Sequence, residues 1–127
     1  MITGYVSSNL DPLISLTVYG ALGEMREVTA VVDTGYFGYL TLSTDVIAAL
    51  GLVPAGDQQL TLADGSVIDS TLCPATIIWD GQPRTIEVDA IDSESLAGMS
   101  LLKGHELNMQ VIAGGPVTIN PLQQPSP

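Results

Sequence analysis

The chain has 127 residues, 46% of them hydrophobic and only 13% charged, which suits a single domain with a dense core. Fourteen acidic residues against three basic ones give a formal net charge of −11, and this charge argues against binding to nucleic acid or to anionic membrane surfaces. No apolar stretch is long enough to span a bilayer, and the first ten residues do not resemble a secretory signal. We therefore expect a soluble, cytoplasmic protein.

The first half of the chain predicts short strands. Residues 13–19 and 26–32 are rich in β-forming side chains and flank a turn that contains two glycines. The second of these segments ends in three consecutive apolar residues, which indicates a strand that enters the core. A further short strand is expected at 39–42.

The stretch from Thr44 to Leu50 is the one segment that predicts a helix. Ser43 or Thr44 can cap its N-terminus, Asp45 suits the first turn, and Gly51 can end it.

Two Asp-Gly pairs predict hairpins in the second half of the chain. Asp64-Gly65 lies between β-forming runs at 59–63 and 66–70, where a type I′ turn is expected. Asp80-Gly81 follows a strand at 75–79, and a longer loop is expected to connect it to a strand at 85–91. The last strands are expected at 107–112 and 117–119.

Seven to nine short strands with one short helix indicate an all-β barrel or sandwich. One domain over residues 1–120 is expected, followed by a Pro- and Gln-rich tail at 121–127 that predicts disorder. Cys73 is the only cysteine, so no intrachain disulfide can form, and we interpret it as a small buried hydrophobic residue.

The tripeptide Asp33-Thr34-Gly35 is the most informative feature for function. It follows the apolar run Ala30-Val31-Val32 directly, and a carboxylate at the end of a buried strand is costly unless it is hydrogen-bonded or paired. Gly35 permits a tight turn and lets a backbone N–H approach the carboxylate. An Asp that merely caps a turn is the alternative interpretation of the tripeptide alone.

The order of several motifs resembles the retropepsin-like aspartic proteases, in particular their bacterial single-domain members, over about residues 13–119. The motifs are V-V-D-T-G at 31–35, G-Y-L-T-L at 38–42, the helix, L-A-D-G-S at 62–66 and L-A-G-M-S-L-L at 96–102. The resemblance implies a closed or partly open β-barrel with one short helix and an active site at the two-fold axis of a homodimer.

The resemblance also implies roles for individual residues. Asp33 would be the catalytic carboxylate, Thr34 would brace the partner's loop, and Gly35 would allow close approach to substrate. Three residues would support the active-site loop from behind: Leu96, Ala97 and Gly98. Five residues would form the tip of a flap over a bound peptide: Leu62, Ala63, Asp64, Gly65 and Ser66.

The chemistry gives a reason for the dimer. Peptide hydrolysis by carboxylates needs one group that accepts a proton and another that donates one. The chain has one D-T-G, so two chains would each contribute an Asp33 across a two-fold axis. The expected function is a homodimeric aspartic endopeptidase that acts on peptides or unfolded polypeptides without cofactor or metal.

Two departures from the family pattern keep a second interpretation open. Tyr36 follows the D-T-G where the family often has a small residue, and the flap lacks the Gly-rich tip of viral relatives. An aromatic side chain at this place would narrow the cleft or change the solvation of the carboxylate. The alternative function is a non-catalytic dimeric peptide-binding or scaffold module of the same fold.

Other candidate sites are weaker. The block at 98–102 lacks the second glycine of a nucleophile elbow, and no strand is expected before it. His105 is the only histidine, so a Ser-His-Asp site or a metal site built on it has little support, and a surface or turn histidine is expected. Trp79 is expected in the core, with a place in a peptide cleft as the alternative.

Overall fold

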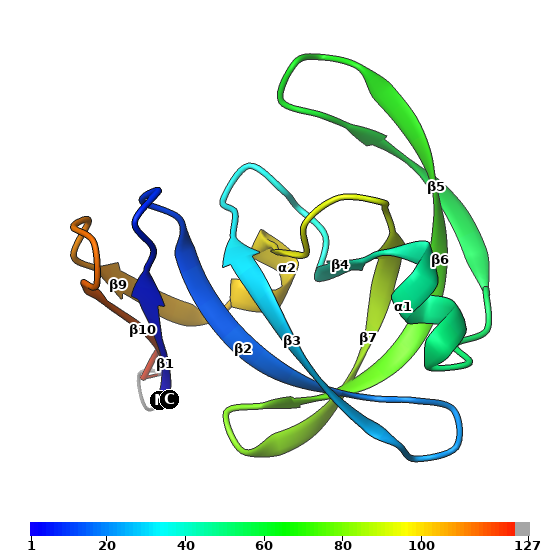
Figure 1. Cartoon of the computed structure of the whole chain (residues 1–127), viewed down its shortest axis with the longest axis horizontal. Coiled ribbons are helices and arrows are strands. Elements are labelled where there is room, and N and C mark those ends of the chain that lie inside the picture. The colour runs from blue at the N-terminus through cyan, green and yellow to red at the C-terminus, as the bar shows by residue number, and fades with distance from the viewer. Residues whose placement is uncertain (124–127) are drawn as a thin grey trace.

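The computed structural model of the protein describes residues 1–123. These residues are mostly β-sheet, so the all-β expectation is confirmed. Ten strands and two short helices follow one another as shown in Figure 1: β1 (Ile2–Val6), β2 (Pro12–Tyr19), β3 (Met25–Val32), β4 (Leu40–Leu42), α1 (Thr44–Ala49), β5 (Gly56–Thr61), β6 (Val67–Trp79), β7 (Gln82–Ala90), β8 (Leu96–Ala97), α2 (Met99–Leu102), β9 (His105–Met109) and β10 (Pro116–Pro121).

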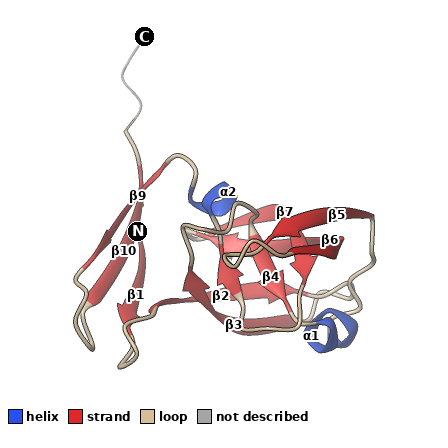
Figure 2. Ribbon diagram, turned by 90° about the horizontal axis from the view of Figure 1, so that it is seen from above, coloured by secondary structure: helices blue, strands red, loops and turns tan. Residues whose placement is uncertain are grey.

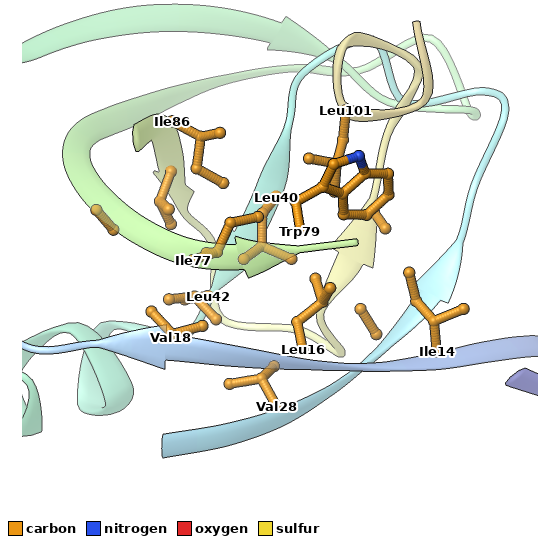
Figure 3. Close-up of a cluster of buried hydrophobic side chains, with 14 of the residues drawn as sticks. Ile14, Leu16, Val18, Val28, Leu40, Leu42, Ile77, Trp79, Ile86 and Leu101 are labelled. Carbon is orange, nitrogen blue, oxygen red and sulfur yellow. The ribbon is translucent and has the colours of Figure 1, made fainter. Parts of the chain in front are cut away.

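Six of the strands surround one hydrophobic core. In sheet order β2, β3, β8, β4, β7 and β6 are hydrogen-bonded neighbours, and a further pairing of β6 with β2 joins the two ends of this series. Side chains alternate along each strand, so every second residue of β2, from Ile14 to Val18, is buried. Figure 3 shows these side chains with others of the core, among them Val28, Leu40, Leu42, Ile77, Trp79, Ile86 and Leu101.

The short strand β8 lies between β3 and β4. It is parallel to β3, with Val32 opposite Ala97, and antiparallel to β4, with Leu40 opposite Ala97. Its two residues are too few to give a periodic pattern, and the sequence did not predict this strand. Because β8 lies beside the end of β3, it provides a rigid support for the loop that begins at Asp33.

Strands β1, β10 and β9 extend the sheet on the far side of β2. β1 pairs with β2 and with β10, and β10 pairs with β9. Figures 1 and 2 show these three strands to one side of the six that surround the core. Val6, Val117 and Ile119 are buried there. β1 was not expected from the sequence, although Ile2–Val6 does alternate in exposure.

The predicted helix is confirmed, with its end one residue earlier. The Ser43 hydroxyl accepts a hydrogen bond from the Val46 amide at 3.3 Å and so caps α1. The Asp92 carboxylate accepts two further bonds, from the amide and the hydroxyl of Thr44, both at 2.8 Å. Gly51 has a φ of +64° just past the helix, a conformation that favours glycine. The second helix, α2, was not predicted.

Both predicted hairpins are present, but the tight two-residue turn is at Asp80-Gly81 and the longer turn is at Asp64-Gly65, the reverse of the expectation. Asp80 and Gly81 have φ values of +50° and +79° and connect Trp79 directly to Gln82, which fits a two-residue type I′ turn. At the other hairpin only Gly65 has a positive φ, +86°. Three residues lie there between Leu62 and Ser66, whose backbones are hydrogen-bonded at 2.8 Å. The dipeptide Asp-Gly occurs in both turns, so it did not predict which of them has two residues and which has three.

The strands predicted at 66–70 and 75–79 belong to one strand, β6. β6 pairs with β5 up to Leu72 and with β2 from Thr76 onward, and it pairs with β7 from Thr71 to Trp79. Pro74 lies where β6 exchanges β5 for β2, a place where a residue without an N–H is tolerated. β6 changes direction between these two pairings. Its first half therefore projects together with β5 as a hairpin, at the top of Figure 1.

Three smaller expectations can be compared with the structure. Cys73 is fully buried and free, as predicted. The tail predicted at 121–127 begins inside β10, whose last residue is Pro121, and residues 124–127 lie outside the described part of the chain. Within residues 1–123, neither helix has the length and apolarity needed to cross a membrane.

Candidate active site

Asp33 is held by hydrogen bonds at the end of β3. Its amide donates to the carbonyl of Ala97 at 2.9 Å, which continues the β3–β8 pairing by one residue. The Gly35 amide donates to Oδ1 of the Asp33 carboxylate at 2.8 Å, as expected from the sequence. The Tyr36 amide closes the turn by donating to the Asp33 carbonyl at 3.2 Å. Asp33 is partly exposed, so its second carboxylate oxygen can meet a water molecule or a ligand.

Ala97 and Gly98 pack behind this loop. Both are buried, and the amide of Gly98 donates to the Tyr39 carbonyl at 2.9 Å. A methyl group added at Gly98 would lie 2.6 Å from Cδ2 of Tyr36 and closer still to the Gly38 carbonyl oxygen. The next amide, that of Met99, donates to the Tyr36 carbonyl at 2.8 Å. Glycine is therefore required at position 98 for the close approach of two loops.

Tyr36 is buried, with 8% of its surface exposed. Its hydroxyl donates a hydrogen bond to Oδ2 of Asp89, a residue of β7 that is 1% exposed. Burial, followed by the hydrogen bond and the charge of Asp89, raises the pKa of Tyr36 far above its ordinary value. A methyl group at Gly38 would clash with this hydroxyl and lie 2.8 Å from Asp89 Oδ2. The Tyr36 hydroxyl thus points into the protein interior.

Asp89 also binds the root of the β5–β6 hairpin. Its Oδ1 atom accepts hydrogen bonds from Nε2 of Gln58 at 2.6 Å and from the hydroxyl of Ser70 at 2.9 Å. Gln58 and Ser70 are opposite each other in the β5–β6 register. A buried carboxylate needs such donors, because burial without them is costly.

A cavity of about 530 Å³ lies between the Asp33 loop and the hairpin. Among residues 1–123, Asp33 is the only carboxylate in its lining. One wall comes from β5 and the turn that follows it, and apolar side chains dominate the rest. The lining residues are Asp33, Gly35, Tyr36, Phe37, Gln59, Leu60, Thr61, Leu62, Ala63, Ile91, Ser93 and Leu96. The arrangement can hold an extended apolar chain against one carboxylate.

The residues expected at the flap tip divide into two groups. Leu62 and Ala63 line the cavity with Asp33, whereas Asp64, Gly65 and Ser66 do not. All five are exposed. The Asp64 carboxylate accepts bonds from the amide and the hydroxyl of Ser66, at 2.9 and 2.5 Å, and these bonds lower its pKa. The outer three residues therefore shape the turn.

Thr34 and Leu96 complete the set expected from the sequence. Leu96 lines the cavity, and its amide donates to the Thr41 hydroxyl at 2.8 Å. Thr34 is exposed, and its hydroxyl makes no hydrogen bond within the part of the chain that the structure describes.

The other candidate residues lie away from this cavity. Trp79 is 6% exposed and belongs to the core, which confirms the first interpretation of this residue. Its Nε1 donates to Nε2 of His105 at 3.1 Å, so His105 is a half-buried strand residue with an engaged ring, not a free surface histidine. Among residues 1–123, no three His, Cys, Asp or Glu side chains lie close enough together to hold a metal ion.

Sequence reasoning missed Asp89, Gln58, Ser70 and Thr41. Asp89 follows Ile86 and Val88 in a strand where alternation gives it the outward face. This face is covered by the hairpin root and by Tyr36, which are distant in the sequence. The one available signal was Tyr36 itself, because a buried tyrosine hydroxyl usually has a partner.

Comparisons of the chain with protein-family models, with curated proteins and with solved structures gave no match.

Proposed function

We propose that the chain is one protomer of a homodimeric aspartic endopeptidase with a retropepsin-like fold, in which Asp33 is the catalytic carboxylate. One observation carries the proposal: Asp33, on a loop backed by β8, is the only carboxylate of the described residues that faces the cavity of about 530 Å³ under the β5–β6 hairpin. The D-T-G and L-A-G motifs meet at this point, because Asp33 N–H binds Ala97. The hairpin is the proposed flap.

The second carboxylate would come from a second copy of the chain. Figure 1 shows the Asp33 loop (cyan), the β1–β2 and β9–β10 turns and the hairpin tip at the same edge of the molecule. This edge carries exposed apolar side chains, which are Phe37 at 75% exposure, Leu10 at 52%, Val111 at 58% and Ile112 at 62%. Such surface favours association, and Thr34, exposed beside Asp33, is free to contact a partner.

The proposed reaction needs only the two carboxylates and water. Two such groups close together share one proton, as aspartic-protease pairs do. The ionised carboxylate removes a proton from water as the water oxygen attacks the peptide carbonyl carbon. The protonated carboxyl group donates its proton to the carbonyl oxygen. The tetrahedral diol then collapses: the carboxyl group that took the water proton donates it to the amine nitrogen as the C–N bond breaks. The other carboxylate accepts a proton from a diol hydroxyl, which restores the shared proton of the pair. No covalent enzyme intermediate forms.

The cavity favours an extended peptide with apolar side chains. Phe37, Leu60, Leu62, Ile91 and Leu96 all contribute to its lining. Strand β5 pairs only with β6 in the described part of the chain, so its other edge can hydrogen-bond an added peptide strand. Side chains of that strand would alternate between the cavity and solvent.

The proposal is tested with the purified protein and its Asp33→Asn variant on an unfolded polypeptide over acidic to neutral pH. We expect cleavage by the wild type only, and inhibition by a pepstatin-type transition-state mimic. An Asp45→Asn variant is the matched control, because Asp45 is an exposed residue of α1 that does not line the cavity. Equal binding of intact peptide by wild type and Asp33→Asn, without cleavage, would instead favour the non-catalytic peptide-binding module.

A further inference from the structure

One residue pair marks the root of the β5–β6 hairpin. Gln58 and Ser70 are opposite each other, and both side chains donate to the same oxygen of Asp89. Beyond this pair, residues 61–67 are all exposed. The Gln58–Ser70 pair therefore attaches the hairpin to Asp89, and the exposed tip lies beyond the half-buried Leu60 and Ile68.

The other oxygen of the same carboxylate binds the active-site loop. Asp89 Oδ2 accepts the hydrogen bond from the Tyr36 hydroxyl, and the Tyr36 amide in turn donates to the Asp33 carbonyl. Asp89 thus joins the hairpin root on one side to the loop of Asp33 on the other. Asp89 is 1% exposed and does not line the cavity with Asp33, so it does not face the proposed substrate.

A single carboxylate that accepts from both elements fixes their relative position. Three donors from three separate segments converge on Asp89, which β7 holds between β6 and β4. Hydrogen bonds to a buried ionised group are stronger than those between neutral groups. Displacing the hairpin root would leave part of this charge unpaired, so motion is expected only beyond the Gln58–Ser70 pair.

We propose that Asp89 is a positioning residue that sets the hinge of the flap and holds the flap root in register with the Asp33 loop. The role as a flap rests on the proposed peptidase function. The attachment of the hairpin root to Asp89 does not rest on that function, and it can be measured in the protein without substrate.

The test removes the donors and keeps the carboxylate. A Gln58→Met and Ser70→Ala double variant detaches the hairpin root and leaves the bond between Asp89 and Tyr36. Tyr36→Phe removes the bond between Asp89 and Tyr36 and keeps the bonds from Gln58 and Ser70. Gln59→Met is the matched control for amide exchange, because Gln59 is the neighbouring glutamine, is exposed, and makes no side-chain hydrogen bond within residues 1–123.

Hydrogen exchange of the backbone amides gives the primary readout. In the double variant, protection of the amides at 59–69 is expected to fall about tenfold or more, because the lost bonds end on a charged group. Gln59→Met and Tyr36→Phe should keep the hairpin protected. Unchanged hairpin protection in the double variant, or an equal loss of hairpin protection in Gln59→Met or in Tyr36→Phe, would overturn the proposal.

Peptide hydrolysis gives the second readout. The double variant is expected to raise KM about tenfold with a smaller change in kcat, and its pH profile should keep the wild-type shape because Asp33 is untouched. An unchanged KM would contradict the flap role. If the wild type hydrolyses no peptide, the peptidase proposal fails, and amide exchange still decides whether Asp89 holds the hairpin.

Discussion

The hydroxyl group of Tyr36 donates a hydrogen bond to the buried carboxylate of Asp89, 53 residues further along the chain. This relationship explains how an aromatic residue can follow D-T-G beside the cavity that Asp33 faces. Gly38 and Gly98 leave the space in which the ring lies, and the hydroxyl is engaged away from Asp33. The ring contributes to one wall of the cavity without a free polar group.

Removal of this hydroxyl should destabilise the protein. Tyr36→Phe leaves a carboxylate oxygen of Asp89 without its donor, so the free energy of unfolding is expected to fall by about 1–3 kcal/mol. Urea unfolding measures the change. Tyr5→Phe is the control, because Tyr5 is 54% exposed, and its effect should stay within about 0.5 kcal/mol. Equal stability of wild type and Tyr36→Phe would show that the buried bond contributes nothing.

Stability should also decline at alkaline pH. The pKa of Tyr36 is raised above its ordinary value of 10.0 in the folded protein, so the folded state keeps a proton that the unfolded state releases. The Tyr36 contribution is therefore complete below about pH 10 and decreases as the pH rises further. Burial raises the pKa of Cys73 as well, with the same sign.

The contribution of Tyr36 can be separated by comparing two proteins. Urea unfolding of wild type and Tyr36→Phe at several pH values above 10 should show a steeper decline for the wild type, by at most about 1.4 kcal/mol per pH unit. Parallel curves would mean that Tyr36 ionises equally in the folded and unfolded states.

Gly98 should be the glycine least tolerant of substitution near the site. Gly98→Ala places a methyl group 2.6 Å from Tyr36 Cδ2 and 2.7 Å from its carbonyl oxygen. We expect a loss of about 1–3 kcal/mol in stability and no peptide hydrolysis, because the Asp33 loop must shift. Gly56→Ala is the control, since its methyl group meets no atom within 4 Å. Wild-type activity in Gly98→Ala would contradict the close packing behind the loop.

Elements with strong local signals were predictable from the sequence. The helix has its cap residue, its acidic first turn and its terminal glycine within nine positions. Strands β2 and β3 are long runs of β-forming residues, and their predicted bounds differ from the observed ones by one residue. The position of Asp33 at the end of β3 followed from the apolar run before it.

Features that depend on distant contacts were not predictable. β8 has two residues, and its strand geometry comes from pairing with β3 and β4. Alternation along β7 gives Asp89 an outward-facing position, and it is buried only because the hairpin root and Tyr36 cover it. The two Asp-Gly turns differ because register, and not the dipeptide, sets how many residues each turn spans.

Thr34 should matter for association and not for the folding of a single chain. Thr34→Val is expected to raise the dimer dissociation constant by about tenfold, the loss of one hydrogen bond or more at an interface. The thermal stability of the dilute protein should stay unchanged. Sedimentation over a range of concentrations measures the first quantity. Thr29→Val, on an exposed position of β3, should leave both unchanged, and an equal effect of both variants would exclude a contact specific to Thr34.

Subunit mixing tests the proposed shared active site most directly. Wild type and Asp33→Asn are unfolded together in known ratios and refolded, and the rate of peptide hydrolysis is measured at constant total protein. If each site needs one Asp33 from each of two chains, mixed dimers are inactive and the rate follows the square of the wild-type fraction. A rate that follows the wild-type fraction linearly would show that one chain suffices and would contradict the account.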